Sequence, residues 1–340
     1  MILEKNERNP ILKPNHQNNW ESLSVCNPGI WYDDGIFYML YRAAGNDEEH
    51  IIRFGLAISR DGINFERLSN TPVFSPSEDG PDSGSIEDPR IVKFGGEYYV
   101  TYAYRPYPPG CYWTFNHEEV RLPNVSENAP IAYRNNITNT GLALTRDFKS
   151  WHRLGRISQS NLDDRDSILF PEKINGKYVL LHRPKEWTGP EYGCEYPSIW
   201  ITFSNDLMVW NETNHLLIKG RKGTWEEKVG GSAPPLRTED GWLLLYHGVD
   251  QGGKGFYRVG AVLLDLENPT KIIARSKDWI MEPEKYYEME GFYKGCVFPT
   301  GNVIVDDTLY IYYGGADKYV CVATCSVKKI LDYLKCFKVT

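Results

Sequence analysis

An acidic pair directly before a proline is the first stretch of this sequence that could do chemistry. Glu87 and Asp88 precede Pro89 and Arg90, and a strand-like run occupies residues 91–94. This arrangement places two carboxylates and a guanidinium at the end of a strand, where a carboxyl group can transfer a proton to a bound molecule. Asp88 is therefore the candidate acid. On a solvated turn, the same residues would form only a surface salt bridge.

The same pattern recurs along the chain and predicts a series of β-hairpins. Each copy has a proline step, an apolar strand, a turn rich in Asp, Asn or Gly, and a second strand. Asn-Gly, Asp-Gly and Gly-Gly turns supply the positive φ angles that tight hairpins require. A third strand follows each hairpin. The five proline steps are at Pro28, Pro89, Pro171, Pro234 and Pro299.

Five such units, repeated at roughly 60 to 80 residues, predict an all-β fold, a single five-bladed β-propeller domain. Two stacked sandwiches would not explain one proline at the first strand of every copy. Residues 328–335 have a helical apolar spacing and predict a short C-terminal helix. The loop 105–139 is long enough to be functional. Within the domain, residues 1–340, the predicted blades are about 25–70, 84–155, 165–215, 228–275 and 292–326.

Composition excludes several classes of partner. The chain of 340 residues has a formal net charge of −7 and no basic run, which argues against a nucleic-acid partner. The sequence begins with no signal-like segment and contains no apolar run long enough to span a membrane, so we expect a cytoplasmic protein without a membrane partner. Its seven cysteines are scattered without a CxxC pair, which predicts reduced thiols and no metal site.

The predicted fold brings polar residues from all five copies together. The first strand of each propeller blade lines the central channel, so the proline steps converge on one axis. Carboxylates and cations in one cleft indicate an acid that protonates a leaving group, beside a site for an anion. The candidates are Asn27, Glu87, Asp88, Glu172, Lys173 and Ser232 at the first strands, with Arg42, His182, Arg183, His247 and Asp317 at second-strand ends.

Several phrases of the sequence resemble glycoside hydrolase family 130, the β-mannoside phosphorylases. The resemblance extends from about residue 20 to the C-terminus. Residues 9–14 and 41–47 are most similar to the branch that acts on β-1,2-mannobiose or β-1,2-oligomannan. The phrases that carry the family resemblance are Glu87-Asp88-Pro89-Arg90 and residues 169–178, 181–184, 241–248 and 312–317.

The resemblance implies a fold and a reaction. The family is a five-bladed propeller, and its members cleave β-mannosides with inorganic phosphate and inversion, releasing α-mannose 1-phosphate. No cofactor is implied, because phosphate is a co-substrate. The expected partners are an oligosaccharide, phosphate and further copies of the same chain in a homo-oligomer.

The resemblance also implies a role for each candidate residue. Asp88 is the general acid, whose proton reaches the glycosidic oxygen through the 3-hydroxyl of the mannose that is cleaved. Phosphate replaces the base of an inverting hydrolase and must be held by cations. The implied phosphate ligands are Arg42, Lys173, His182, Arg183 and His247. The residues implied to bind mannose hydroxyls are Asn27, Asp166 and Asp317.

Four alternatives stay open at this point. The family includes β-mannosidases that use glutamate as a base, for which Glu226 and Glu227 are available. It also includes phosphorylases of β-1,4-mannosyl-glucose and β-1,4-mannosyl-N-acetylglucosamine, with the acceptor site expected on loops such as 105–139. Propeller glycosidases acting on arabinose, xylose or fructose would have an aspartate where Asn27 stands. A lectin would not require several cations around one carboxylate.

Overall fold

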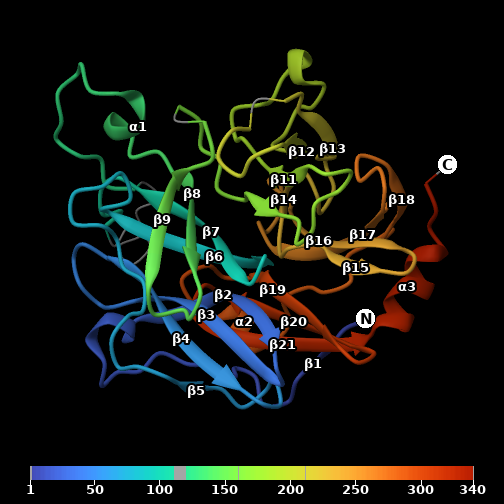
Figure 1. Ribbon diagram of the computed structural model, residues 1–340, viewed down its shortest axis with the longest axis horizontal. Helices are drawn as coiled ribbons and strands as arrows, with labels where there is room; N and C mark the ends of the chain where they lie inside the picture. The colour runs from blue at the N-terminus through green and yellow to red at the C-terminus, as the bar shows by residue number, and fades with distance from the viewer. Residues whose placement is uncertain (1, 111–119, 160, 211, 340) are drawn as a thin grey trace.

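Antiparallel sheets surround a central axis in the described part of the chain and form a five-bladed propeller, as predicted (Figure 1). The computed structural model describes residues 2–110, 120–159, 161–210 and 212–339. Blade 1 contains β2 (Ser24–Asp33), β3 (Ile36–Ala44), β4 (Ile52–Ser59) and β5 (Glu66–Arg67). Blade 2 contains β6 (Ser85–Phe94), β7 (Glu97–Arg105), β8 (Asn139–Thr145) and β9 (Trp151–Arg156).

The remaining blades follow in chain order. Blade 3 contains β10 (Ile168–Leu169), β11 (Tyr178–His182), β12 (Ile199–Ser204) and β13 (His215–Ile218). Blade 4 contains β14 (Lys228–Gly231), β15 (Leu236–Thr238), β16 (Gly241–Val249), β17 (Tyr257–Leu264) and β18 (Ile272–Arg275). Blade 5 contains β19 (Val297–Val305), β20 (Thr308–Gly315), β21 (Tyr319–Ser326) and, from the other end of the chain, β1 (Glu4–Lys5).

The helical elements are short and lie outside the sheets. They are η1 (Asn19–Glu21), α1 (Ile131–Arg134), η2 (Pro190–Tyr192), α2 (Tyr286–Met289) and α3 (Val327–Lys335). The predicted C-terminal helix is therefore present as α3, and the Ser326 side chain caps it by accepting a hydrogen bond from the Lys329 N–H at 3.1 Å. No helix in the described residues is long and apolar enough to cross a membrane.

Apolar side chains are buried between neighbouring blades. Alternate residues of the strands point to opposite faces of each sheet, so each blade packs against the blade before it and the blade after it. One cluster joins blades 4 and 5 and includes Leu245, Val297 and, from α3, Ile330 and Leu334. Another joins blades 3 and 4 around Trp242. Because every blade buries its faces on its neighbours, the inner strands are held around one axis.

Residues 120–138, the second part of the predicted functional loop after β7, project from the ring and carry α1 (Figure 1). Asn136 connects the two ends of this loop by hydrogen bonds. Its Oδ1 accepts a hydrogen bond from the Tyr107 N–H at 3.1 Å, and its carbonyl accepts one from Arg105 Nη1 at 2.7 Å. Part of this loop, residues 111–119, lies outside the described residues.

Candidate active site

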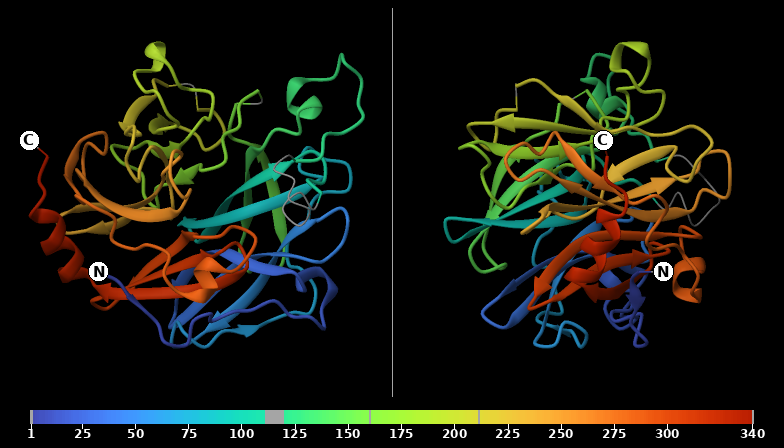
Figure 2. Two further views of the ribbon diagram at one scale, coloured as in Figure 1. Left: turned by 180° about the vertical axis from the view of Figure 1, so that it is seen from behind. Right: turned by 90° about the vertical axis from the view of Figure 1, so that its right-hand side faces the viewer.

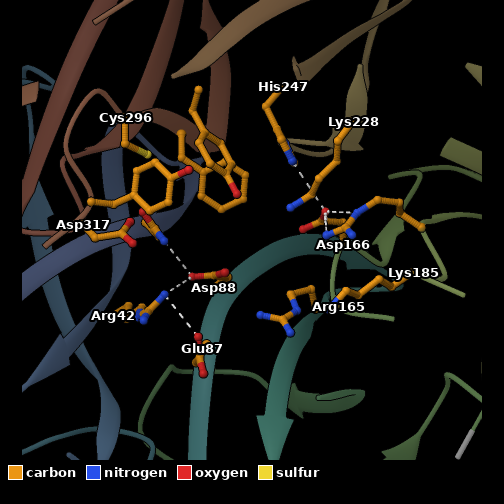
Figure 3. A pocket seen from close by; sticks show the side chains of 15 residues that line it. Arg42, Glu87, Asp88, Arg165, Asp166, Lys185, Lys228, His247, Cys296 and Asp317 are labelled. Carbon is orange, nitrogen blue, oxygen red and sulfur yellow. Dashed lines mark hydrogen bonds and ion pairs between the residues drawn. The ribbon is translucent and has the colours of Figure 1, made fainter. Parts of the chain in front are cut away.

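A cavity of about 320 Å³ is lined by side chains of the inner strands and the segments next to them (Figure 3). All five blades contribute to its wall, so the cavity exists only when the ring is closed. Its lining residues are Asn27, Arg42, Glu87, Asp88, Arg165, Asp166, Arg183, Lys185, Lys228, His247, Tyr257, Tyr293, Cys296, Phe298 and Asp317.

Backbone bulges at two proline steps direct the acid and its partner into the cavity. The pairing of β2 with β3 shifts between Cys26 and Gly29, and that of β6 with β7 shifts between Glu87 and Arg90. Within these bulges Asn27 and Asp88 adopt left-handed backbone conformations, with φ of +45° and +54°. Asn and Asp tolerate this region better than other residues with a Cβ atom. The residue types at the two steps therefore suit the bulge as well as the chemistry.

Asp88 is held by one oxygen and presents the other. Its Oδ1 accepts hydrogen bonds from Asn27 Nδ2 at 2.8 Å and Arg42 Nη1 at 3.0 Å. Its Oδ2 has no hydrogen-bond partner among the residues that the structure describes. A carboxyl group oriented in this way can exchange a proton with a bound molecule through Oδ2.

Two further carboxylates share this side of the cavity with Asp88. Arg42 Nη1 lies 3.3 Å from Glu87 Oε2. Burial would raise the pKa of Glu87, but the charges of Arg42 and Arg105 hold it below its ordinary value. Burial raises the pKa of Asp317 to about 6; the Arg42 guanidinium opposes this rise, and the charges of Asp88 and Glu87 add to it. This acid side therefore consists of Asp88, Glu87 and Asp317 around one guanidinium.

The opposite side is cationic and is built around Asp166. Arg183 forms a two-pronged ion pair with this carboxylate, with Nε at 2.8 Å and Nη2 at 2.7 Å from Oδ2. His247 Nε2 lies 3.7 Å from the same oxygen. Burial lowers the pKa of His247 to about 3, and although Asp166 opposes this, the Arg183, Lys228 and Arg90 cations contribute to it. At neutral pH His247 is therefore an uncharged hydrogen-bonding group.

Two lysines add positive charge that the protein does not neutralise. The ammonium groups of Lys228 and Lys185 have no hydrogen bond or ion pair within the described ranges, although Lys228 lies 5.8 Å from the ring centre of Tyr257. The pKa of Lys228 is lowered to about 7, mainly by burial and also by the charges of the nearby Arg183 and Arg165. Lysines crowded among guanidiniums in this way can bind an anion.

Aromatic side chains form the wall between the two sides. Tyr257 stacks on His247, with ring centres 5.4 Å apart and planes at 24°. Tyr293 meets Tyr257 edge-on at 5.0 Å, and Phe298 also lines the cavity. Faces of this kind pack against the C–H groups of sugar rings. The cavity thus combines a carboxyl group, a cluster of cations and an aromatic wall.

Most of the predicted site residues converge on this cavity, and the convergence follows from strand pairing. Ile168 pairs with Leu181, so the segment before β10 runs beside the segment after β11. The residues that line the cavity as expected are Asn27, Arg42, Glu87, Asp88, Asp166, Arg183, His247 and Asp317.

Two predicted phosphate ligands lie elsewhere, which corrects the prediction. Lys173 is exposed because β10 leads away from the cavity and Lys173 follows the far end of this strand. Its Nζ lies 4.2 Å from the ring centre of Tyr178. His182 precedes Arg183 and points the other way, as neighbours on a strand do. Its imidazole is buried between Asp164 Oδ2 at 2.9 Å and Asn214 Oδ1 at 2.7 Å.

Four other candidates also lie outside the cavity wall. Glu172 is exposed and paired with Arg237 at 3.4 Å, and the carbonyl of Ser232 accepts a hydrogen bond from Arg90 at 2.7 Å. The two possible hydrolytic bases are occupied as well. Glu226 accepts a hydrogen bond from the Tyr246 hydroxyl at 2.8 Å, and Glu227 accepts one from the Gln251 N–H at 3.0 Å.

Sequence reasoning missed three cations, two of which lie within two residues of a predicted residue. Arg165 precedes Asp166, and Lys185 follows two residues after Arg183. Lys228 begins β14, the inner strand of blade 4, where the proline step was expected to mark the channel. For Arg165 and Lys185, the signal available in the sequence was therefore proximity to predicted residues, whereas Lys228 had no such signal.

A five-bladed propeller in which a carboxyl group faces a cluster of cations across one cavity has the features of a carbohydrate-active enzyme. The chain belongs to glycoside hydrolase family 130, whose family model, described as beta-1,4-mannooligosaccharide phosphorylase, matches residues 3–111 and 117–336.

Individual relatives are similar over nearly their whole length. The chain is 40% identical to a 1,2-beta-oligomannan phosphorylase of Thermoanaerobacter sp. (strain X514), over 94% of this chain and 96% of the relative. It is 36% identical to a beta-1,2-mannobiose phosphorylase of the same organism, again over 94% and 96%. The solved structure of beta-1,2-mannobiose phosphorylase from Listeria innocua in complex with beta-1,2-mannobiose superposes with a TM-score of 0.79 at 27% identity, covering 99% of this chain and 100% of that one.

Proposed function

We propose that the protein is an inverting phosphorylase of β-1,2-linked manno-oligosaccharides, yielding α-mannose 1-phosphate and a shortened sugar. The observation that carries this proposal is the pair of unneutralised ammonium groups, Lys185 and Lys228, across the cavity from Asp88. The β-1,2 linkage is supported by the names of the two relatives at 40% and 36% identity.

In the proposed reaction, a phosphate oxygen attacks the anomeric carbon from the cationic side. The bond between that carbon and the glycosidic oxygen breaks, and a bond from the carbon to phosphate forms. The proton of Asp88 passes through the sugar 3-hydroxyl to the leaving oxygen. Because phosphate is itself the nucleophile, the reaction needs no carboxylate base. Opposite faces of the cavity therefore serve the two ends of one displacement.

The positions of the side chains support a revised set of roles. We assign phosphate to Arg165, Lys185 and Lys228, with Arg183 and uncharged His247 as further donors. Arg42, Asn27 and Asp317 are assigned to the mannose at the acid side. Asp166 is assigned to orienting Arg183, because that guanidinium occupies its Oδ2. No cofactor is proposed, and the cytoplasmic location and homo-oligomeric state stay predictions.

Two readings within the family are less well supported. A hydrolase would require a carboxylate that activates water, but Glu226 and Glu227 are bound to other groups away from the cavity. A β-1,4 specificity agrees with the description of the family model, whereas the relatives named above act on β-1,2 linkages by name.

Incubation with defined disaccharides tests the proposal. β-1,2-mannobiose, β-1,4-mannobiose and mannosyl-N-acetylglucosamine are each supplied with and without phosphate, and mannose 1-phosphate is measured. We expect product from β-1,2-mannobiose only when phosphate is present. Free mannose formed equally well without phosphate would contradict phosphorolysis, and product from a β-1,4 substrate alone would correct the linkage.

A further inference from the structure

Arg90 is a buried charged residue that lies next to the cavity without lining it. Its side chain is 1% exposed, so it does not meet solvent or a bound sugar. Burying a guanidinium is costly unless its N–H groups are bonded and its charge is balanced. An arginine in this position therefore needs a structural or functional reason.

The guanidinium of Arg90 joins four blades at the channel. Nη1 donates to the carbonyl of Asp88 at 3.1 Å, and Nε donates to the carbonyl of Ser232 at 2.7 Å. Nη2 donates to Asp166 Oδ1 at 3.4 Å, and the guanidinium carbon lies 5.8 Å from the ring centre of Phe298. These partners come from blades 2, 3, 4 and 5. A planar group with five N–H donors can serve three acceptors in fixed directions, which a lysine cannot do.

The bond to Asp166 divides that carboxylate between two cations. Oδ1 faces Arg90, while Oδ2 faces Arg183 and His247. Without Arg90, Oδ1 would lose its only described partner, and the carboxylate could rotate about its axis. Arg183 would then lose its fixed orientation toward the anion site, because both of its contacts converge on Oδ2, which moves when the carboxylate rotates.

The bond to the Asp88 carbonyl acts on the acid. Asp88 has a left-handed backbone in the bulge of β6, and Arg90 bonds the carbonyl of that same residue. One side chain thus supports the backbone of the acid and the carboxylate that orients the cationic side.

We propose that Arg90 is a positioning residue that keeps the acid and the phosphate site in register, acting on phosphate through Asp166 and Arg183. This inference rests on the proposed phosphorolysis. Displacement of a nucleophile by a fraction of an ångström is sufficient to slow an in-line reaction. Arg90 therefore matters to the reaction without touching either substrate.

The test compares Arg90→Lys, Asp166→Asn and the double variant. The measurements are KM for phosphate, KM for β-1,2-mannobiose, and the Kd for inorganic phosphate by calorimetry. We expect Arg90→Lys to raise both phosphate constants by about tenfold or more, with a change of under about threefold in KM for the disaccharide. We expect the double variant to match Asp166→Asn, since both changes break one chain of contacts. Arg146→Lys, with its side chain 79% exposed, is the matched control.

The possible outcomes separate this inference from the proposed function. A wild-type enzyme that neither binds phosphate nor forms mannose 1-phosphate would overturn the proposed function and this inference with it. If the wild type does both, unchanged phosphate constants in Arg90→Lys, or effects that multiply in the double variant, would overturn the inference alone. If Arg90→Lys does not fold, the Asp166→Asn variant provides the test, because Arg90 keeps its two carbonyl partners in that variant. A phosphate Kd equal to the wild-type value in Asp166→Asn would contradict the proposal.

Discussion

Asp88 is the residue on which the proposed chemistry depends most directly. We expect Asp88→Asn to lower kcat by about 10²- to 10⁴-fold, because the amide keeps the shape of the side chain but supplies no proton. The Kd for β-1,2-mannobiose, measured by calorimetry, should stay close to the wild-type value. Asp79→Asn, at an exposed position, is the control. If Asp88→Asn keeps its turnover, with or without a loss of binding, Asp88 is not the acid.

Lys228 should give phosphate binding a pH dependence. With its pKa lowered to about 7, Lys228 carries a positive charge below that pH and loses it as the pH rises. We therefore expect KM for phosphate to increase above about pH 7 in the wild type. Lys228→Arg should reduce this increase, because a guanidinium stays charged throughout the range.

Comparing the wild type with Lys228→Arg separates the titration of Lys228 from that of phosphate. Phosphate itself titrates in the same range, but it does so equally in assays of the wild type and of Lys228→Arg. The difference between their profiles of KM against pH from 6 to about 9 therefore reports the side chain. Superimposable profiles would mean that Lys228 does not bind phosphate in its charged form.

At the residue scale, sequence reasoning was most reliable where a residue type served two purposes. Asp88 and Asn27 fit both the chemistry and the left-handed backbone of the bulge, so the sequence marked them clearly. Lys173 was misleading, because its phrase matches the family while the direction of β10 carries it away from the cavity. Lys228 was missed for the opposite reason: the segment Lys228-Val229-Gly230-Gly231 has no distinctive local pattern, and only packing shows that the lysine lines the cavity.

At the scale of elements, hairpin signals predicted the blades and their order. Turn residues and alternation are local properties of the sequence, and the observed strands follow them closely. What local patterns could not predict is which side chains face the axis. A bulge inserts an extra residue, so the side chains after it point to the opposite faces of the sheet. This occurs at Asn27 in β2 and at Asp88 in β6.

The bulge at Asn27 in β2 lies close to Gly314 in β20, and this contact can be tested. A Cβ atom on Gly314, in β20, would overlap Oδ1 of Asn27. We expect Gly314→Ala to displace the Asn27 amide from Asp88 and to lower kcat by about 10-fold or more. The loss should shrink in an Asn27→Ala background, where the added methyl group has room.

Gly252→Ala provides the matched control, because a Cβ there meets nothing within 4 Å. Steady-state kinetics of the wild type, Gly314→Ala, Asn27→Ala, the double variant and Gly252→Ala, with melting temperatures to exclude general unfolding, give the answer. Equal losses with and without the Asn27 side chain would show that Gly314 acts through some other contact.

At the scale of the whole molecule, the ring is closed by the N-terminal segment. β1 pairs with β21 at the outer edge of blade 5, and Leu3 is buried in the cluster between blades 4 and 5. The N-terminus accordingly lies beside α3 (Figure 2). Because the cavity draws residues from every blade, we infer that closing the ring and forming the site are a single event.

Asn9 offers a way to weaken this closure without touching the cavity. Its Nδ2 donates to the Val322 carbonyl and its Oδ1 accepts from the Val322 N–H, both at 2.8 Å, and the side chain is buried. Asn9→Ala leaves both backbone groups without these partners, so we expect the free energy of unfolding in urea to fall by about 1–3 kcal/mol. Asn128→Ala, at an exposed position, should change it by less than about 0.5 kcal/mol.

Activity and tryptophan fluorescence should be lost at the same urea concentration in both variants, because the site is assembled from all blades. Activity lost well before fluorescence would show that the site opens while the ring stays closed.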